Sequence, residues 1–340
     1  MSKALIIRLS AIGDVAMTIP VLYSAALANP SDEFTMLTQQ TLLPLFINAP
    51  ANLHLIAFEN DDKPFFRFLK FAIKLAGKDF DAALDLHNVI RSRIISLLFS
   101  LKGRKVFTLD KLRREQRLLT RKPPKTVRPL RPVVQRYKDV FHAAGFQFDL
   151  IFSSLFETST PPLPRDIPEK QGLWIGVAPF AKHRGKIYPT EKMRQVLEML
   201  TQRRDDLTVF LFGGGEAERS VLEGWAADCP RTVNVAGRYS LGDELALISR
   251  LDVMLCMDSA NMHFASLVGV RAVSVWGATH PAAGFFGYRQ PAELAIQAAL
   301  PCRPCSIYGN RPCYRGDYDC MNSIMPEEIY LKMINSIPTT

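Results

Sequence analysis

The chain has 340 residues, of which 48% are hydrophobic and 22% charged, a composition that excludes a disordered protein and leaves room for two domains with separate cores. No apolar run reaches the roughly 18–20 residues that a membrane-spanning helix needs. Only six residues separate Lys3 from Ser10, which is too short for a signal-peptide core, so we expect a cytoplasmic protein.

The formal net charge of +9 comes from the first half of the chain. Residues 1–165 hold 24 Lys and Arg against 14 Asp and Glu, whereas residues 166–340 hold 18 against 19. Residues 102–138 alone contain 14 basic residues, two acids and four prolines, so they cannot form one long helix. Such a run is most often a solvated face. Concentrated on one domain, it also suggests a polyanionic partner: nucleic acid, an anionic membrane surface or a phosphorylated substrate.

Predicted strands and helices alternate through the first half. A buried strand at 4–9 is followed by Gly13, which permits a tight turn, and by a helix over 15–28 with a kink at Pro20. The turn lacks the G-x-G-x-x-G pattern, so a nicotinamide cofactor is unsupported. Further strands are predicted at 34–37, 53–57, 81–86 and 105–108, and further helices at 64–76, 91–101 and 132–144.

The second half repeats this alternation after a proline-rich stretch at 157–172, which is typical of a linker. A strand at 173–178 leads into a polar loop, and Thr190 is a plausible cap for the next helix. Strands are predicted at 207–212, 232–235, 253–257 and 271–276, and helices at 190–204, 216 onward, 241–250, 261–267 and 326–334.

The β-α-β rhythm predicts an α/β protein built from two Rossmann-like domains, whose parallel sheets face a central cleft. We expect a first domain over 1–160, a linker over 161–172 and a second domain over 173–325. The last segment, 326–340, is expected to form a helix that packs back toward the first domain.

Polar residues follow the predicted strand at 253–257. Asp258, Ser259 and His263 would lie at the carboxyl end of that strand, where α/β sheets bind ligands and where a helix N-terminus attracts phosphates. The competing interpretation is a helix cap and a core histidine, and these residues alone give the two about even odds.

Two other turns carry candidate residues. Gly213, Gly214 and Gly215 follow a strand and would let a ligand approach the backbone closely, although glycines are common in such turns. Asp14 follows the first strand, where it would serve either as a helix cap or as a general base facing a cleft.

Together these residues carry a family resemblance. The ordered set looks like the lipopolysaccharide heptosyltransferases, glycosyltransferase family 9, which have the two-domain GT-B fold. The resemblance runs from residue 4 to about residue 335. It rests on SAIGD at 10–14, KIYP at 186–189, GGGE at 213–216 and DSxxxHxA at 258–265.

The resemblance implies inverting transfer of heptose from ADP-heptose to a lipid A–Kdo or heptosylated core acceptor. Asp14 matches the family's proposed base, and Lys186 matches its phosphate-binding lysine. Glu216 matches the acid that holds the nucleotide ribose. Asp258 and His263 match positions near the donor sugar and diphosphate, and we favour Asp258 as a contact to sugar hydroxyls. Backbone donors next to Gly214, Gly215 and Ser259 would complete the donor site, with no metal and no cofactor besides the nucleotide sugar.

The match is incomplete at two places. Tyr188 stands where the family commonly has a tryptophan, so we expect Tyr188 to take over as the packing aromatic. The basic loop corresponds to the acceptor-facing region but does not align residue by residue. The candidates there for acceptor phosphates and carboxylates are Arg91, Arg93, Arg113, Arg114, Arg117 and Arg136.

The six cysteines fall into two groups. Cys229 and Cys256 lie in apolar patterns and read as inert core residues. The other four stand in a Pro/Gly-rich tail segment with a spacing that is not a standard zinc ribbon, so free or structural thiols are favoured over a zinc site. These four are Cys302, Cys305, Cys313 and Cys320.

Three functions stay open at this point. The favoured one is a peripheral enzyme at the cytoplasmic face of the inner membrane, with an ADP-sugar donor and an anionic lipid-linked acceptor such as the lipopolysaccharide core. The second is a catalytically inactive protein that keeps the fold and binds a polyanion. The third is nucleic-acid binding, which no recognised motif supports, so we expect no nucleic-acid partner.

Overall fold

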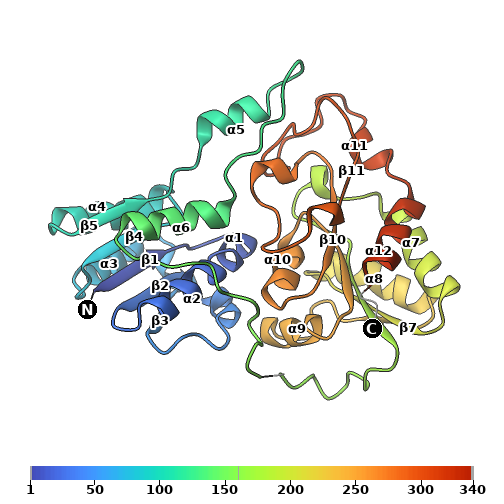
Figure 1. Ribbon diagram of the computed structural model, residues 1–340, viewed down its shortest axis with the longest axis horizontal. Coiled ribbons are helices and arrows are strands. Elements are labelled where there is room, and N and C mark those ends of the chain that lie inside the picture. Colours follow the sequence, from blue (N-terminus) through green and yellow to red (C-terminus); the bar gives the residue numbers. More distant parts are fainter. Residues whose placement is uncertain (1, 160, 338–340) are drawn as a thin grey trace. The chain divides into compact units, whose positions relative to one another are not determined.

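The computed structural model describes residues 2–159 and 161–337, which fall into two compact units (Figure 1). The first unit holds the residues up to Lys111 together with Arg131–Leu155. The second holds Leu112–Leu130 and the residues from Phe156 onward. Each unit contains one fully parallel sheet with helices packed on it, which confirms the predicted α/β class with two Rossmann-like domains.

The sheet of the first unit has five strands in the order β3-β2-β1-β4-β5. Its central strand β1 pairs with β2 through Ile7 and Leu37, and with β4 through Ile7 and Asp85. The carboxyl ends of β1 and β4 are therefore neighbours. The strands are β1 (Lys3–Ile7), β2 (Glu33–Gln39), β3 (Leu53–Phe58), β4 (Ala82–Asp85) and β5 (Lys105–Thr108).

The helix predicted over 15–28 is in fact two helices, α1 (Ile12–Ala16) and α2 (Ile19–Ala28). Pro20 lies in the first turn of α2, where its missing N–H breaks no hydrogen bond, so it begins a helix and does not kink one. The Thr18 hydroxyl donates to the Val15 carbonyl at 2.7 Å across the break.

The remaining helices of the first unit cover its sheet. The short 3₁₀ helices η1 (Gln40–Leu45) and η2 (Asn60–Asp62) flank β3. Apolar residues of α3 and α4 form one buried core with β1 and β3, and α2 contacts α6. These helices are α3 (Phe65–Ala76), α4 (Ile90–Leu101) and α6 (Val133–Ala143), all close to their predicted bounds.

The sheet of the second unit has six strands in the order β11-β10-β9-β6-β7-β8. Its four central strands are buried along most of their length, as expected when helices cover both faces, whereas the edge strands β8 and β11 are partly exposed. Only β11 was not predicted from the sequence. The strands are β6 (Leu173–Ala178), β7 (Leu207–Leu211), β8 (Thr232–Asn234), β9 (Val253–Met257), β10 (Ala272–Trp276) and β11 (Ala295–Gln297).

The predicted helices of the second unit begin and end close to their expected positions, whereas α11 and the 3₁₀ helices were not predicted. The predicted cap of α7 is displaced by one residue, because Pro189 is the N-cap and Thr190 is the first helical residue. Within the described residues, no helix is both long and apolar enough to cross a bilayer. The helices are α7 (Thr190–Arg203), α8 (Glu216–Asp228), α9 (Leu241–Ile248), α10 (Ala260–Leu267), α11 (Asp319–Asn322) and α12 (Pro326–Ser336), with 3₁₀ helices η3 (Arg184–Lys186), η4 (Pro281–Ala283) and η5 (Ala292–Leu294).

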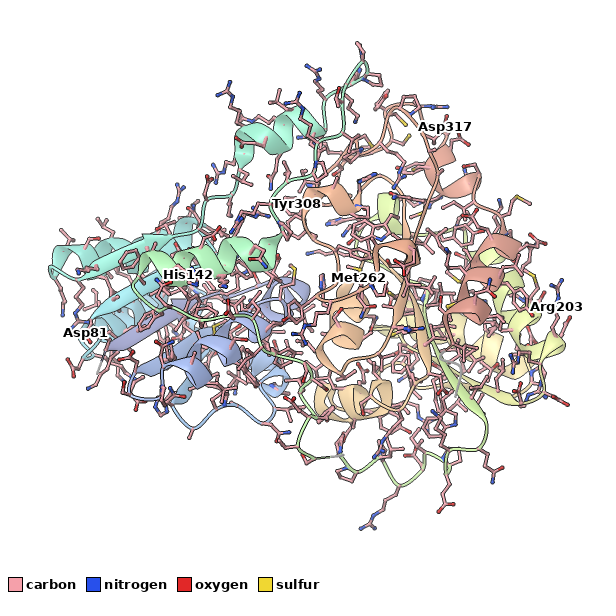
Figure 2. All side chains as sticks on the ribbon, viewed as in Figure 1. Asp81, His142, Arg203, Met262, Tyr308 and Asp317 are labelled. Atoms are coloured by element: carbon pink, nitrogen blue, oxygen red, sulfur yellow. The ribbon has the colours of Figure 1, made fainter. Side chains whose placement is uncertain are left out.

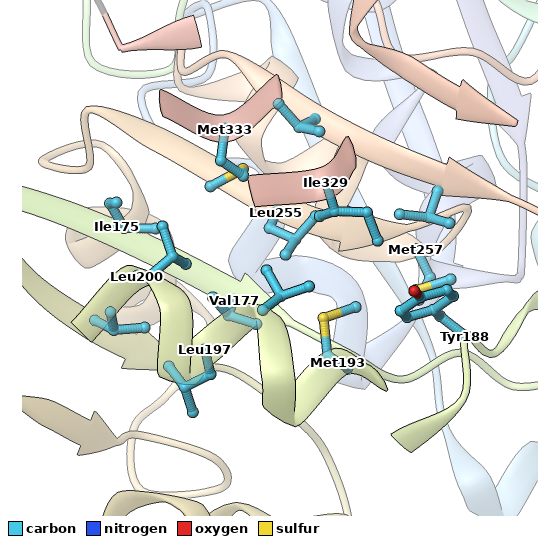
Figure 3. Close-up of a cluster of buried hydrophobic side chains, with 14 of the residues drawn as sticks. Ile175, Val177, Tyr188, Met193, Leu197, Leu200, Leu255, Met257, Ile329 and Met333 are labelled. Carbon is cyan, nitrogen blue, oxygen red and sulfur yellow. The ribbon is translucent and has the colours of Figure 1, made fainter. Parts of the chain in front are cut away.

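The last helix packs on the sheet of its own unit, where α12 contacts α7, β9 and β10. That it also packs back toward the first domain stays a prediction. Its Ile329 and Met333 are fully buried in a core that includes Ile175, Leu200 and Leu255 (Figure 3). The apolar residues of α12 recur every three to four positions, and the second sheet is the surface that buries them.

The basic segment Leu112–Leu130 also differs from expectation. The sequence assigned it to the first domain, whereas its contacts group it with the second unit. It contains an unpredicted helix, α5 (Arg113–Leu119). Lys125 donates to the carbonyls of Cys302 and Pro304, and the Leu130 amide donates to Ala282 at 2.8 Å.

We predict that Ile329→Ala and Met333→Ala each lower the free energy of unfolding of the second unit by about 2–4 kcal/mol, because each leaves a cavity in its core. Urea unfolding followed by tryptophan fluorescence reports this unit, since all three tryptophans, Trp174, Trp225 and Trp276, lie in it. The control is Leu331→Ala on the exposed side of α12. Equal changes for all three variants would contradict the observed packing.

Candidate active site

The second unit holds a buried ion pair at the carboxyl edge of its sheet. Asp258 follows the last residue of β9 and is only 5% exposed, and its amide donates to the Val275 carbonyl at 3.2 Å. Lys186 ends η3 and places its Nζ 2.8 Å from Oδ2 of Asp258. The sequence proposed both residues as site residues, and the structure brings them into contact. Largely shielded from water, this ammonium can also bind an anionic ligand oxygen.

The Lys186 side chain is held in place by backbone that the sequence did not single out. Gly309 has a φ of +74°, and a Cβ there would lie 2.6 Å from Cγ of Lys186. The backbone carbonyl of Gly185 accepts a hydrogen bond from Ala278 at 2.8 Å. The tail after β11, where Figure 2 labels Tyr308, therefore packs directly on the lysine stem. The only sequence signal was a glycine in a Pro/Gly-rich segment.

The first turn of α10 adds backbone donors next to Asp258. Ser259 is the N-cap in extended conformation, yet its side chain makes no capping hydrogen bond. Its Oγ is buried and has no hydrogen-bond partner among the described residues. Farther along α10, Met262, which Figure 2 labels, and its neighbour His263 are both buried. A helix N-terminus whose capping hydroxyl is still available is suited to an anionic ligand.

The glycine turn is open at the N-terminus of α8. Gly215 has a φ of +82°, and nothing would lie within 4 Å of a Cβ on Gly214 or Gly215. The Gly214 amide already donates to Oε2 of Glu218 at 2.8 Å. The Glu216 side chain is 80% exposed and lies 3.3 Å from the Arg219 guanidinium. Its carboxylate is therefore accessible to a ligand hydroxyl.

In the first unit, Asp14 forms an ion pair of its own. It lies in the first turn of α1, with Oδ2 2.6 Å from the guanidinium of Arg8. Arg8 is buried and also donates to the Leu86 carbonyl at 2.8 Å. The ion pair fixes the direction of the Asp14 carboxylate, whose side chain is still 22% exposed. Arg8 was not predicted as a site residue, because one arginine at a strand end gives no signal in a sequence.

His87 lies beside this pair, and the sequence missed it as well. It follows β4, and its Nδ1 accepts a hydrogen bond from the Leu9 amide at 3.4 Å. Burial, followed by the charges of Arg8 and Lys111, lowers the pKa of His87 from 6.5 to about 3. The ring is therefore neutral at physiological pH. Oδ1 of buried Asp85 fixes the turn by accepting from the His87 amide at 2.9 Å.

The six arginines proposed for the acceptor have different environments. Arg91 stacks on the rings of Phe58 and Phe68 and donates to a backbone carbonyl, and Arg136 is buried and donates to Asp110. Both have structural roles in the first unit. The other four are exposed: Arg93 on α4, and Arg113, Arg114 and Arg117 on α5 of the second unit.

Of the tyrosine and the tail cysteines that the sequence singled out, Tyr188 packs in the core, and the cysteines form no disulfide. Tyr188 is fully buried, and its hydroxyl donates to the Ile324 carbonyl at 2.8 Å, so it is a packing residue. The four tail cysteines, Cys302, Cys305, Cys313 and Cys320, are free thiols. Within residues 2–159 and 161–337, no three His, Cys, Asp or Glu side chains are grouped as a metal site.

An open hollow of about 480 Å³ lies elsewhere in the second unit, between α8 and β8. Arg219, Asn234 and Arg238 contribute to its lining, but none of the proposed site residues does. The two charged pairs, Arg8–Asp14 and Lys186–Asp258, therefore lie outside this hollow.

Comparison with known proteins identifies the family of this chain. The family described as glycosyltransferase family 9 (heptosyltransferase) matches residues 68–311. The lipopolysaccharide core heptosyltransferase OpsX of Haemophilus influenzae is 26% identical, over 85% of this chain and 80% of that protein. Lipopolysaccharide heptosyltransferase 1 of Pseudomonas aeruginosa is 23% identical, over 89% of this chain and 86% of that protein.

Solved structures share the fold at low identity. A family 9 glycosyltransferase from Veillonella parvula superposes with a TM-score of 0.73 at 17% identity, covering 99% of this chain and 97% of that one. The E. coli heptosyltransferase WaaC, solved with ADP, gives 0.68 at 16% identity, covering 98% and 99%. The fold is thus that of the GT-B heptosyltransferases. Since the family match spans well over half of its residues, the chain belongs to glycosyltransferase family 9 and is a glycosyltransferase.

Proposed function

We propose that this glycosyltransferase moves a heptose, or a related sugar, from an ADP-sugar to an anionic lipid-linked acceptor such as the lipopolysaccharide inner core. It would act in the cytoplasm, at the inner face of the inner membrane. The observation that carries the proposal is the buried Lys186–Asp258 pair at the N-terminus of α10. The names of the relatives support the sugar and the acceptor, and the E. coli structure with bound ADP supports the nucleotide.

The second unit would hold the donor. In this proposal the Lys186 ammonium and the first amides of α10 bind the diphosphate and stabilise the negative charge that develops as ADP leaves. Asp258 orients Lys186 and accepts from sugar hydroxyls, with His263 nearby on the same helix. Glu216 accepts from the ribose hydroxyls, and Gly214 and Gly215 leave room for the nucleotide to approach the backbone.

The first unit would supply the base. Asp14 takes the proton of the acceptor hydroxyl while that oxygen attacks the anomeric carbon from the side opposite the diphosphate. The new glycosidic bond forms as the bond to the diphosphate oxygen breaks, so the anomeric configuration inverts. Arg8 keeps the carboxylate pointed in one direction, and the neutral His87 adds no positive charge beside it.

The exposed arginines would guide the acceptor. Arg93, Arg113, Arg114 and Arg117 offer planar guanidinium groups that suit the phosphates and carboxylates of an anionic core. Arg91 and Arg136 are weaker candidates, because backbone carbonyls and aromatic rings already engage them. The attraction of the basic segment to anionic lipid would assist the same encounter.

The first test is Asp14→Asn, which keeps an acceptor oxygen for Arg8 but removes the base. We predict that turnover, measured as ADP release from ADP-heptose with a lipid A–Kdo acceptor, falls about 10²–10⁴-fold. Donor affinity, measured by calorimetry, stays within about twofold because the donor residues are untouched.

The control for this variant is Asp79→Asn, which removes an exposed carboxylate paired with Lys3 in the same unit. Turnover of Asp14→Asn within a few-fold of the wild type would refute the base assignment. A wild-type protein that binds ADP-heptose but never turns it over would instead identify an inactive polyanion-binding protein.

The second test is Gly309→Ala, whose methyl group would collide with the stem of Lys186. We predict that kcat falls about tenfold or more, because the ammonium is displaced from the diphosphate. Gly316→Ala is a matched control, since Gly316 has a similar φ of +81° but nothing within 4 Å of its Cβ position. Equal kcat values for the two variants would show that Gly309 does not position Lys186.

A further inference from the structure

Helix α4 has an unusual distribution of side chains. Ile90, Leu97 and Leu101 are 79%, 58% and 74% exposed, and their spacing of seven and four residues puts them on one outward stripe. Ser92 and Ser96 are buried on the opposite side of the helix. A surface helix normally directs its polar residues toward water, so the outward face of α4 is unusually apolar.

Helix α3 repeats the feature. Phe66 is 84% exposed and Ile73 is 53% exposed, and their separation of seven residues places them on the same face. Phe65 at the start of the helix is 60% exposed. The helix buries Phe68 and Leu75 on its other side, so it has enough apolar surface for the core without these three residues.

The two apolar faces belong to one surface. α3 and α4 pack side by side, and Phe68 and Ala72 of α3 share a buried cluster with Ile95 and Phe99 of α4 (Figure 1). Because both helices bury their inner sides in the same core, their outward stripes point away from the sheet on the same side. Isolated exposed apolar residues are ordinary, but a group of this size on adjacent helices marks an interaction surface.

The charges on α3 and α4 themselves are of one sign, although Asp61, Asp62 and Asp79 lie just beyond the ends of α3. Residues 63–78 and 86–109 contain no Asp or Glu. None of the ion pairs in the described part of the chain involves the three cations of α3. The exposed cations next to the apolar stripes are Arg67, Lys70, Lys74, Arg93 and Lys102.

We propose that the outward face of α3 and α4, here called the α3–α4 face, docks on an anionic phospholipid surface. The apolar side chains would enter the boundary between headgroups and acyl chains, and the cations would contact the phosphates. A second copy of this chain fits poorly, because a two-fold interface would place cations against cations. The inference rests on the proposed function in one respect: a lipid-linked acceptor, which lies in a membrane, explains why the protein would bind one.

The test is co-sedimentation of the full chain with vesicles of phosphatidylethanolamine and phosphatidylglycerol. We expect binding that weakens with added salt and is much weaker on phosphatidylcholine vesicles. Phe66→Gln/Ile90→Gln/Leu101→Gln should lower the partition coefficient by about tenfold or more. Arg67→Gln/Lys70→Gln/Lys74→Gln should weaken binding to anionic vesicles and reduce its salt dependence, because three of the cations on this face are lost.

A control replaces three apolar residues elsewhere that are 56–57% exposed, Leu27→Gln/Ile151→Gln/Leu331→Gln, and should bind vesicles like the wild type. The inference is overturned if the wild type does not bind anionic vesicles, or if the first triple variant binds as well as this control. It is also overturned if that variant only abolishes a concentration-dependent dimer. Sugar transfer to an acceptor fragment without acyl chains distinguishes the two proposals. If the wild type does not transfer sugar to this fragment, only the proposed function is contradicted. We expect Phe66→Gln/Ile90→Gln/Leu101→Gln to transfer sugar to this fragment as fast as the wild type does.

Discussion

The contact between the Lys186 ammonium and the Asp258 carboxylate is the interaction on which the proposed donor site depends. A carboxylate that is 5% exposed at a strand end is costly unless a cation accompanies it, and losing that partner typically costs about 3–5 kcal/mol. The pair therefore holds Lys186 at the sheet edge before any ligand arrives. An ammonium that is already positioned loses little side-chain freedom when a diphosphate binds.

The first unit applies the same principle with the signs exchanged. Buried Arg8 holds the partly exposed carboxylate of Asp14, just as buried Asp258 holds the partly exposed ammonium of Lys186. In both units the buried partner lies just beyond the carboxyl end of a central strand, β1 in one sheet and β9 in the other. That edge is where parallel sheets bind ligands, so each unit places one oriented charged side chain where a ligand could reach it.

The sequence predicted those features of the fold and of the candidate site that depend on neighbouring residues in the chain. Strands β6 and β9 were predicted to the residue, because continuous apolar runs bounded by polar turns define buried parallel strands. Asp258 and Lys186 were proposed from short motifs, and their contact was not. Arg8, His87 and Gly309 were missed, since their roles come from contacts between segments far apart in the chain. The destinations of α12 and of the basic segment are likewise tertiary facts that no local pattern encodes.

The affinity of ADP for Lys186→Ala, determined by calorimetry beside the wild type, tests whether the ammonium held by Asp258 binds the diphosphate. A charge-assisted contact of this kind predicts a Kd about 10- to 100-fold higher, with Lys182→Ala in the same loop unchanged. Thermal unfolding of the variant would confirm that the second unit remains folded. If folded Lys186→Ala binds ADP as tightly as the wild type does, Lys186 does not bind the diphosphate.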